Sequence, residues 1–240
     1  FQPSTFVCGV ANGPCEVAAT CTGTDALCPP NGTLPDSDND GVCDAIDVCT
    51  NIGGGQDFAA AKPKPRLVVG KIESDPTPSN DTLTLTGAFV IHDGPAFSTV
   101  DPATNGARVV INNVAGVNRV DAMLVGATYM GHGTRGWKLS KTDKTWTYTD
   151  TTGSPVAGIV SVVIVDKSRV GPALTVPGQV QVRVVGRKST YPVVLGDEPL
   201  TAVVVLGGQA QAEAGYCGET AFAPGECTWN PKHNALTCKK

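Results

Sequence analysis

Residues 82–91, TLTLTGAFVI, alternate between threonine and apolar residues over their first half. In an extended chain, one side then carries the apolar side chains, which are Leu83, Leu85, Phe89 and Ile91. The other side carries the three threonines. A period of two is typical of a β-strand that turns one face toward a hydrophobic core. This stretch therefore predicts a half-buried strand.

The same period recurs along residues 62–240. QVQVRVV (179–185) repeats it, with valines opposite glutamine and arginine. Other strand-like runs lie at 107–113, 118–125, 144–149, 159–165 and 200–206. Turn-forming residues such as His92-Asp93-Gly94 separate these runs, and helical periodicity is almost absent. The sequence therefore predicts an all-β domain over 62–240, an antiparallel β-sandwich of the jelly-roll type.

The longest apolar runs are IVSVVIV (159–165) and TAVVVL (201–206). Both have the length of a strand and are too short to cross a bilayer, so no membrane span is expected. IVSVVIV has almost no polar face, which favours a central strand covered on both sides.

The charge of the chain argues against nucleic acid as a partner. The 240 residues include 18 Lys and Arg and 22 Asp and Glu, a formal net charge of −4. No basic cluster is dense enough to follow a phosphate backbone.

Nine cysteines gather near the two ends of the chain: Cys8, Cys15, Cys21, Cys28, Cys43, Cys49, Cys217, Cys227 and Cys238. Zinc is not indicated, because no C-x2-C pair occurs and only three histidines are present. Disulfides fit better and predict an extracellular or cell-surface protein. Because nine is odd, at least one cysteine must be free, capped or bonded to another chain. Sequons at Asn31 and Asn80 are compatible with a glycoprotein.

Residues 34–50, LPDSDNDGVCDAIDVCT, place five aspartates in register with a glycine. If Asp36 is position 1, carboxylates occupy positions 1, 3, 5, 9 and 12, and Gly41 is position 6. This spacing is typical of a Ca2+ loop, in which position 7 offers a backbone carbonyl. The predicted ligands are Asp36, Asp38, Asp40, the carbonyl of Val42 and Asp47, with Asp44 in support. A solvated acidic turn is the alternative.

DSDNDGVCDAIDVC resembles the calcium repeat of thrombospondin type 3 domains, in which an acidic loop is followed by a cysteine, here Cys49. Cys43 inside the loop departs from that pattern. CGVANGPCEVAATCTGTDALCP (8–29) resembles the cysteine-rich segments related to disintegrin domains, although it lacks an Arg-Gly-Asp-type loop. The two resemblances imply that residues 1–61 form an irregular segment held by disulfides and calcium. A connector rich in Gly and Pro follows at 53–66.

DPTPSNDTLTLTG, TRGWKLSK, GYCGETAF and LTCK resemble a β module of secreted proteins from environmental bacteria, and this resemblance implies no particular activity. Residues 214–240 are expected to form a terminal hairpin pinned by disulfides. Cys217, Cys227 and Cys238 would contribute to this clasp, with Trp229 packed beside it.

No catalytic pattern is apparent. His92, His132 and His233 each lie in a stretch rich in turn formers. The chain has no nucleophile elbow, zinc-binding helix, phosphate loop or dinucleotide fingerprint. The sequence therefore predicts that the protein is not an enzyme.

One open role is a secreted, calcium-dependent carbohydrate-binding or adhesive module. Trp146 and Tyr148 would share one strand face, with Trp137 and Tyr129 nearby in the sequence. Such rings could form a platform for surface glycans, or they could fill the core.

The other role, which we favour from the sequence, is that of a structural subunit in an extracellular filament. FQPSTFV precedes the first cysteine, and its apolar residues Phe1, Phe6 and Val7 have no obvious partner nearby. Burial against a neighbouring copy would resolve this, for example by adding a strand to an open sheet edge. Repeated head to tail, such a contact gives a homopolymer.

Overall fold

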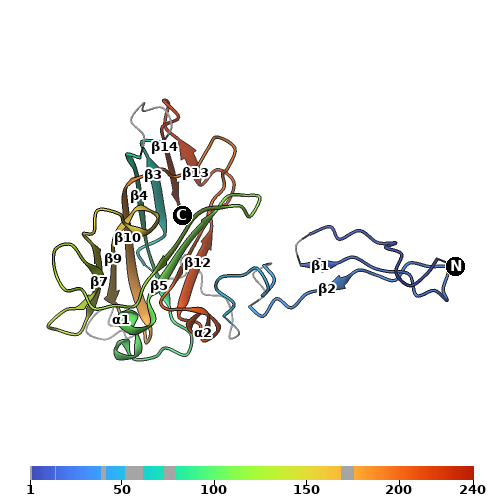
Figure 1. The fold of residues 1–240 in the computed structure, drawn as a ribbon, viewed down its shortest axis with the longest axis horizontal. Helices are drawn as coiled ribbons and strands as arrows, with labels where there is room; N and C mark the ends of the chain where they lie inside the picture. Colours follow the sequence, from blue (N-terminus) through green and yellow to red (C-terminus); the bar gives the residue numbers. More distant parts are fainter. Residues whose placement is uncertain (1, 14, 39–41, 52–61, 73–78, 169–175) are drawn as a thin grey trace.

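The computed structural model describes residues 2–13, 15–38, 42–51, 62–72, 79–168 and 176–240. Phe1, Asp40 and Gly41 lie outside these ranges. The described chain forms a sandwich of two antiparallel β-sheets, from which an N-terminal arm, residues 2–33, projects (Figure 1). The predicted all-β antiparallel sandwich is confirmed.

The larger sheet has eight strands in the order β13-β14-β3-β4-β10-β9-β8-β7. Their bounds in chain order are β3 Arg66–Gly70, β4 Asp81–Val90, β7 Arg135–Leu139, β8 Thr145–Asp150, β9 Ile159–Asp166, β10 Gln179–Ser189, β13 Cys227–Trp229 and β14 Ala235–Lys239.

The smaller sheet has four strands in the order β12-β11-β5-β6. They are β5 Ala107–Asn112, β6 Asn118–Leu124, β11 Thr201–Val205 and β12 Cys217–Ala221. Helical turns occur at η1 Phe97–Thr99, α1 Pro102–Asn105, η2 Val156–Gly158 and α2 Gln209–Glu213. The arm holds one short pair, β1 Glu16–Val17 and β2 Gly32–Thr33. The sandwich thus divides its strands eight and four.

The hydrophobic core lies between the two sheets. TLTLTGAFVI forms β4, and Leu83, Leu85 and Phe89 are buried as their spacing predicts. The rings of Trp137 and Tyr148 are also fully buried, with centroids 5.2 Å apart. These two rings fill the core and are not available as a sugar platform.

Trp146 is half-buried and packs against the same core. Its indole nitrogen donates a hydrogen bond of 2.7 Å to the carbonyl oxygen of Val100. The edge of this ring is therefore committed to the fold as well.

Two strands without a polar face differ in how they are covered. β9 lies inside the larger sheet, but Val163 and Val165 on its outer side are only partly buried, so the predicted coverage of both faces is wrong. In β11, by contrast, Val204 faces the core while Val203 and Val205 are buried on the opposite face. The smaller sheet is therefore covered on both sides.

The β7 edge of the larger sheet is covered by the chain itself. The backbone N–H of Trp137 donates to the oxygen of Ala127 (2.7 Å), and that of Tyr129 donates to the oxygen of Trp137 (2.9 Å). Gly136 permits this approach, because a Cβ there would lie 2.7 Å from the Ala127 oxygen. The opposite edge is β13, with only three residues. Short or covered edges resist pairing with another chain.

A buried carboxylate, Asp197, ties β6 to the loop before β11. Asn113 Nδ2 and the backbone N–H of Val194 each donate to it at 2.8 Å, and the Arg119 guanidinium also donates. Burial raises the pKa of Asp197, but the hydrogen bonds from Asn113, Val194 and Arg119 outweigh this effect and lower the pKa overall.

We expect Asp197→Asn to reduce the free energy of unfolding by about 3 kcal/mol at pH 7, because it breaks a buried charged cluster. A carboxylate with a lowered pKa stabilises the fold above about pH 4, and this contribution disappears as the pH falls through its folded pKa. The difference between wild type and variant should therefore shrink toward pH 3. Urea denaturation at several pH values measures it. The exposed Asp143→Asn serves as control, and a constant difference across pH would contradict the assignment.

Candidate assembly arm and calcium loop

Residues 48–51 lie on the outer face of the smaller sheet and anchor the N-terminal segment to the sandwich. Cys49 forms a disulfide with Cys217 on β12, with an S–S distance of 2.02 Å. A second hydrophobic cluster surrounds this bond and is formed by Cys49, Val110, Val203, Val205, Ala212 and Cys217, with Val48 packed against it. Part of the 1–61 segment is therefore integral to the sandwich.

The neighbouring contact is equally close. Asn51 is fully buried, and Gly215 makes room for it. A Cβ at Gly215 would lie 2.6 Å from the Asn51 Oδ1, and its φ of +75° also favours glycine. A side chain at position 215 would therefore clash with Asn51 of the docked segment.

The pairing of Cys217 corrects part of the expected C-terminal clasp. Only Cys227 and Cys238 bond to each other there, across β13 and β14. Residues 217–221 form β12 in the other sheet, so the terminal hairpin is confined to 227–239. Trp229 does pack at this end, and its indole N–H donates to Glu198 Oε2 at 3.0 Å.

The acidic loop precedes the anchor and already has internal order. Both Asp44 carboxylate oxygens accept hydrogen bonds from Ser37, from its N–H at 2.8 Å and its hydroxyl at 2.7 Å. The Asp44 N–H donates to the Pro35 oxygen at 2.9 Å. Asp47 Oδ1 accepts from the N–H of Cys49 at 2.8 Å. Asp44 therefore braces the loop through Ser37. Its predicted support of the ion, through water or a second ion, stays a prediction.

Three predicted ligands turn a carboxylate oxygen away from solvent: Asp36 Oδ1, Asp38 Oδ2 and Asp47 Oδ2. The sequence from 1 to 61 contains no Lys, Arg or His. Buried carboxylate charge is costly unless a cation accompanies it, and an all-oxygen donor set suits Ca2+. Among the described residues, no three acidic, cysteine or histidine side chains already converge as a metal site. The loop therefore fits the ion in donor chemistry, while its position 5, Asp40, lies outside those residues.

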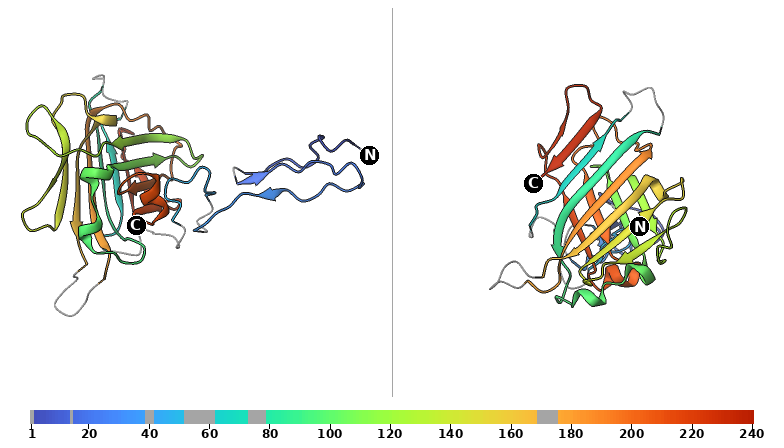
Figure 2. Two further views of the ribbon diagram at one scale, coloured as in Figure 1. Left: turned by 60° about the horizontal axis from the view of Figure 1, so that its bottom comes forward. Right: turned by 90° about the vertical axis from the view of Figure 1, so that its left-hand side faces the viewer.

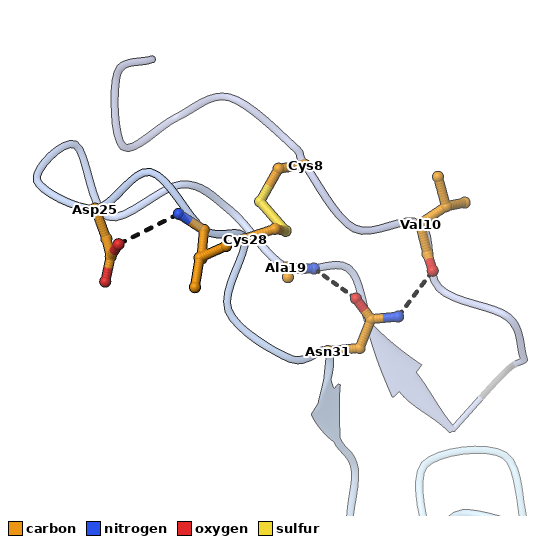
Figure 3. The surroundings of a disulfide bond; sticks show 7 residues. Cys8, Val10, Ala19, Asp25, Cys28 and Asn31 are labelled. Carbon is orange, nitrogen blue, oxygen red and sulfur yellow. Dashed lines mark hydrogen bonds between the residues drawn. A yellow bond between two sulfur atoms is a disulfide. The ribbon is translucent and has the colours of Figure 1, made fainter. Parts of the chain in front are cut away.

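The arm is an irregular ladder closed by a disulfide between Cys8 and Cys28 (Figure 3). Val7 pairs with Thr20, and the N–H of Cys21 donates to the oxygen of Phe6 at 2.9 Å. The backbone around Phe6 and Val7 is therefore already paired within the arm.

Asn31 cross-links three parts of the arm (Figure 3). Its Oδ1 accepts from the N–H of Ala19 at 3.1 Å, and its Nδ2 donates to the Val10 oxygen at 2.8 Å, as Figure 3 shows. Its Nδ2 also donates to Glu16 Oε2 at 3.1 Å. Hydrogen bonds from the N–H of Asn12 and from Asn31 lower the pKa of Glu16. Both amide hydrogens of Asn31 are engaged, so a glycan at this sequon would replace one of them. Asn80 lies half-buried directly before β4.

The arm exposes an unusual share of apolar surface. The exposed fractions are 49% for Phe6, 53% for Val7, 78% for Val10, 49% for Val17 and 78% for Leu27. Figure 1 shows the arm standing clear of the sandwich, so the sandwich does not cover these side chains.

Cys15 and Cys43 lie next to each other, although they are 28 residues apart. The N–H of Cys43 donates to the Cys15 sulfur at 2.7 Å. A hydrogen bond to Cys15 raises the pKa of the buried Cys43 thiol to about 11, and burial adds to this effect. Cys15, Cys43 and Cys21 are all outside the three disulfides of the structure, and Cys21 is partly exposed on the arm.

This contact predicts that Cys15 and Cys43 form a fourth disulfide when the protein matures under oxidising conditions, in which case only Cys21 would keep a thiol. A thiol reagent added to denatured, unreduced protein should then modify one site per chain, and none in Cys21→Ser. Mass spectrometry counts the labels. Three labels per wild-type chain would contradict the prediction.

A groove of about 770 Å³ lies where the loop meets the smaller sheet. Val42, Ile46 and Val48 line it from the loop side, and Val114 and Phe222 from the sheet side. Its one charged lining residue, Arg108, pairs with Asp121 at 2.8 Å. These lining residues offer no acid–base pair for catalysis.

The chain matches no protein-family model, no curated protein and no solved structure, so neither the thrombospondin-like nor the disintegrin-like resemblance is supported by a relative. Among the described residues, no helix has the length and apolar character needed to cross a membrane. Three disulfides fit a protein of an oxidising compartment.

Proposed function

We propose that this protein is a structural subunit of an extracellular filament, in which the arm of one copy packs on the sandwich of the next. The observation that carries the proposal is the arm itself, which projects from the sandwich and leaves Phe6, Val7, Val10, Val17 and Leu27 at its surface. Apolar side chains gathered on one projecting element are typical of an interaction site.

The energetics favour association through this arm. Burial of one large apolar side chain contributes roughly 1.5–3 kcal/mol, so a few such residues offset the entropy of docking a segment already held by a disulfide. Because the arm and the surface that receives it are different parts of the subunit, the contact is heterologous. Such a contact, repeated, extends into a fibre unless its rotation closes a ring.

Calcium in loop 36–47 has a structural part in this proposal. Asp36, Asp38, Asp40, the Val42 carbonyl and Asp47 would hold the ion, and Asp44 would brace the loop through Ser37. The bound ion would neutralise the buried carboxylates at the base of the arm and so stiffen the direction in which the arm leaves the sandwich.

The calcium assignment predicts that each chain binds one Ca2+. Asp47→Asn should abolish this binding, because it removes a ligand charge while its amide oxygen can still accept from the N–H of Cys49. Isothermal titration measures the stoichiometry. Asp25→Asn, on the arm outside the loop, is the matched control, and equal binding by Asp47→Asn would exclude the proposed site.

The filament proposal predicts that wild-type protein polymerises and that Phe6→Ser/Val7→Ser does not. Both side chains are half-exposed, so the melting temperature of the sandwich should change by less than about 2 °C. Sedimentation and negative-stain microscopy detect the polymer. Met130→Ser/Leu195→Ser removes two exposed apolar residues from the sandwich instead and should assemble normally. Wild-type protein that stays monomeric at high concentration, with calcium present, would refute the proposal.

A carbohydrate-binding or adhesive module remains the second candidate function. Its support is the calcium loop alone, because Trp137 and Tyr148 are buried and Trp146 packs on the core.

A further inference from the structure

The exposed face of the larger sheet carries a line of basic side chains. Cross-strand pairing places seven residues in one row from β14 to β7, namely Lys239, Arg66, Thr86, Arg183, Val163, Thr147 and Lys138. All four basic members are exposed, and Arg187 lies exposed on the same side of β10. We name these five basic residues the basic stripe.

One acidic residue borders this face: the N–H of Lys239 donates to the backbone oxygen of Glu226 at 3.0 Å, which places Glu226 opposite Lys239 at the end of the row. Its carboxylate accepts a hydrogen bond of 2.7 Å from the N–H of Ala223. The sheet's strands contain three aspartates, Asp81, Asp150 and Asp166, and each shares its strand's alternation with the inward-facing residues. Asp150 and Asp166 pair with Arg135 and Lys144, respectively. None of the basic-stripe side chains is in an ion pair with another described residue. From β14 to β7 the face therefore presents basic side chains with no outward acidic side chain among the described strand residues.

The arrangement has an energetic cost in the single subunit. Arg66 and Lys239 lie directly opposite each other on adjacent strands, where like charges destabilise a sheet. Neighbouring strands are about 4.8 Å apart, so the row from Lys239 to Lys138 extends over roughly 29 Å. Threonine and valine fill the positions between the charges, which leaves a broad surface with both polar and apolar character.

The basic stripe and the arm lie on opposite sides of the sandwich. The arm leaves from the side of the smaller sheet, whereas the exposed face of the larger sheet points the other way (Figures 1 and 2). The two surfaces therefore cannot meet within one subunit, but they can meet between successive subunits that share one orientation.

The charges of the two surfaces are complementary. The arm has a formal charge of −2 and the basic stripe has +5. The other six acidic residues of 1–61 lie outside the arm, five of them in the proposed calcium loop. On the arm the only charged side chains are Glu16 and Asp25. Asp25 is exposed on the arm, in the stretch that leads to Cys28 and the exposed Leu27 (Figure 3).

We propose that the basic stripe is the surface that receives the arm of a second copy of this chain. The inference rests on the proposed filament and identifies the surface that the arm contacts on the next subunit. The apolar arm residues would lie over the threonines and valines of the face, with Asp25 and Glu16 against arginines and lysines. Addition of a strand to an edge of the larger sheet is less favoured, because segment 127–129 covers β7, β13 has three residues and the arm's backbone is paired internally.

The test reverses two charges of the stripe with Arg66→Glu/Arg183→Glu. Both side chains are exposed, so the fold should persist, as circular dichroism would verify. We expect the concentration needed for assembly to rise at least tenfold. Lys141→Glu/Lys232→Glu makes the same charge change at exposed lysines in the β7–β8 and β13–β14 turns, outside the strand row, and should assemble like wild type.

A mixing experiment separates the two halves of the contact. Phe6→Ser/Val7→Ser keeps the stripe and loses the arm, whereas Arg66→Glu/Arg183→Glu keeps the arm and loses the stripe. Neither should polymerise alone, but their mixture should form 1:1 dimers, because one intact contact remains. Sedimentation velocity measures this, and a mixture that stays monomeric would overturn the proposal.

The outcomes distinguish this inference from the filament proposal. If wild type does not assemble, both fail. If wild type and Arg66→Glu/Arg183→Glu assemble equally, only the stripe assignment fails. If, in addition, wild type binds polygalacturonate and the stripe variant does not, the stripe is a site for an anionic polysaccharide and not for a second copy.

Discussion

β11 and its neighbours in the smaller sheet bury apolar residues on both faces, and the need to cover the outer face organises the rest of the molecule. Val110, Val203 and Val205 are buried there, on a side that would meet water in a simple two-sheet sandwich. Residues 48–51 and α2 cover them, and the Cys49–Cys217 disulfide fixes the cover in place. Residues 48–51 are also the base of the arm. The burial of these valines therefore fixes the side of the sandwich from which the arm projects.

The larger sheet, by contrast, leaves its outer face uncovered and polar. Its outer face has threonine, partly buried valine and five basic residues, while its aspartates follow the inward alternation and bond to Tyr191, Arg135 and Lys144. The acidic N-terminal segment lies beyond the smaller sheet (Figure 2). The subunit thus separates acidic from basic surface along one direction. Such polarity favours association of unlike ends and disfavours association of like ends.

The period of two predicted most of the sandwich, because half-buried strands must alternate. It could not predict which apolar strand is covered twice: IVSVVIV and TAVVV both lack a polar face, yet only TAVVV meets a second layer. That layer comes from α2 and from residues 48–51, and the second of these lies at least 150 positions before β11. The partner of Cys217 was missed for the same reason, since disulfide connectivity depends on distant packing. The basic stripe escaped notice because its residues are scattered from 66 to 239 and meet only through strand register.

The Cys49–Cys217 bond also has a mechanical meaning. The two residues are 168 positions apart, so the bond closes a covalent loop around most of the sandwich. A force that pulls on the arm is transmitted through the Cys49–Cys217 disulfide to β12. The backbone between residues 51 and 62 does not have to carry it. β12 is hydrogen-bonded to β11 along its whole length, so the load is shared by a ladder of bonds. A force that pulls on the arm of this subunit is thus transmitted by covalent bonds to an edge strand of the smaller sheet.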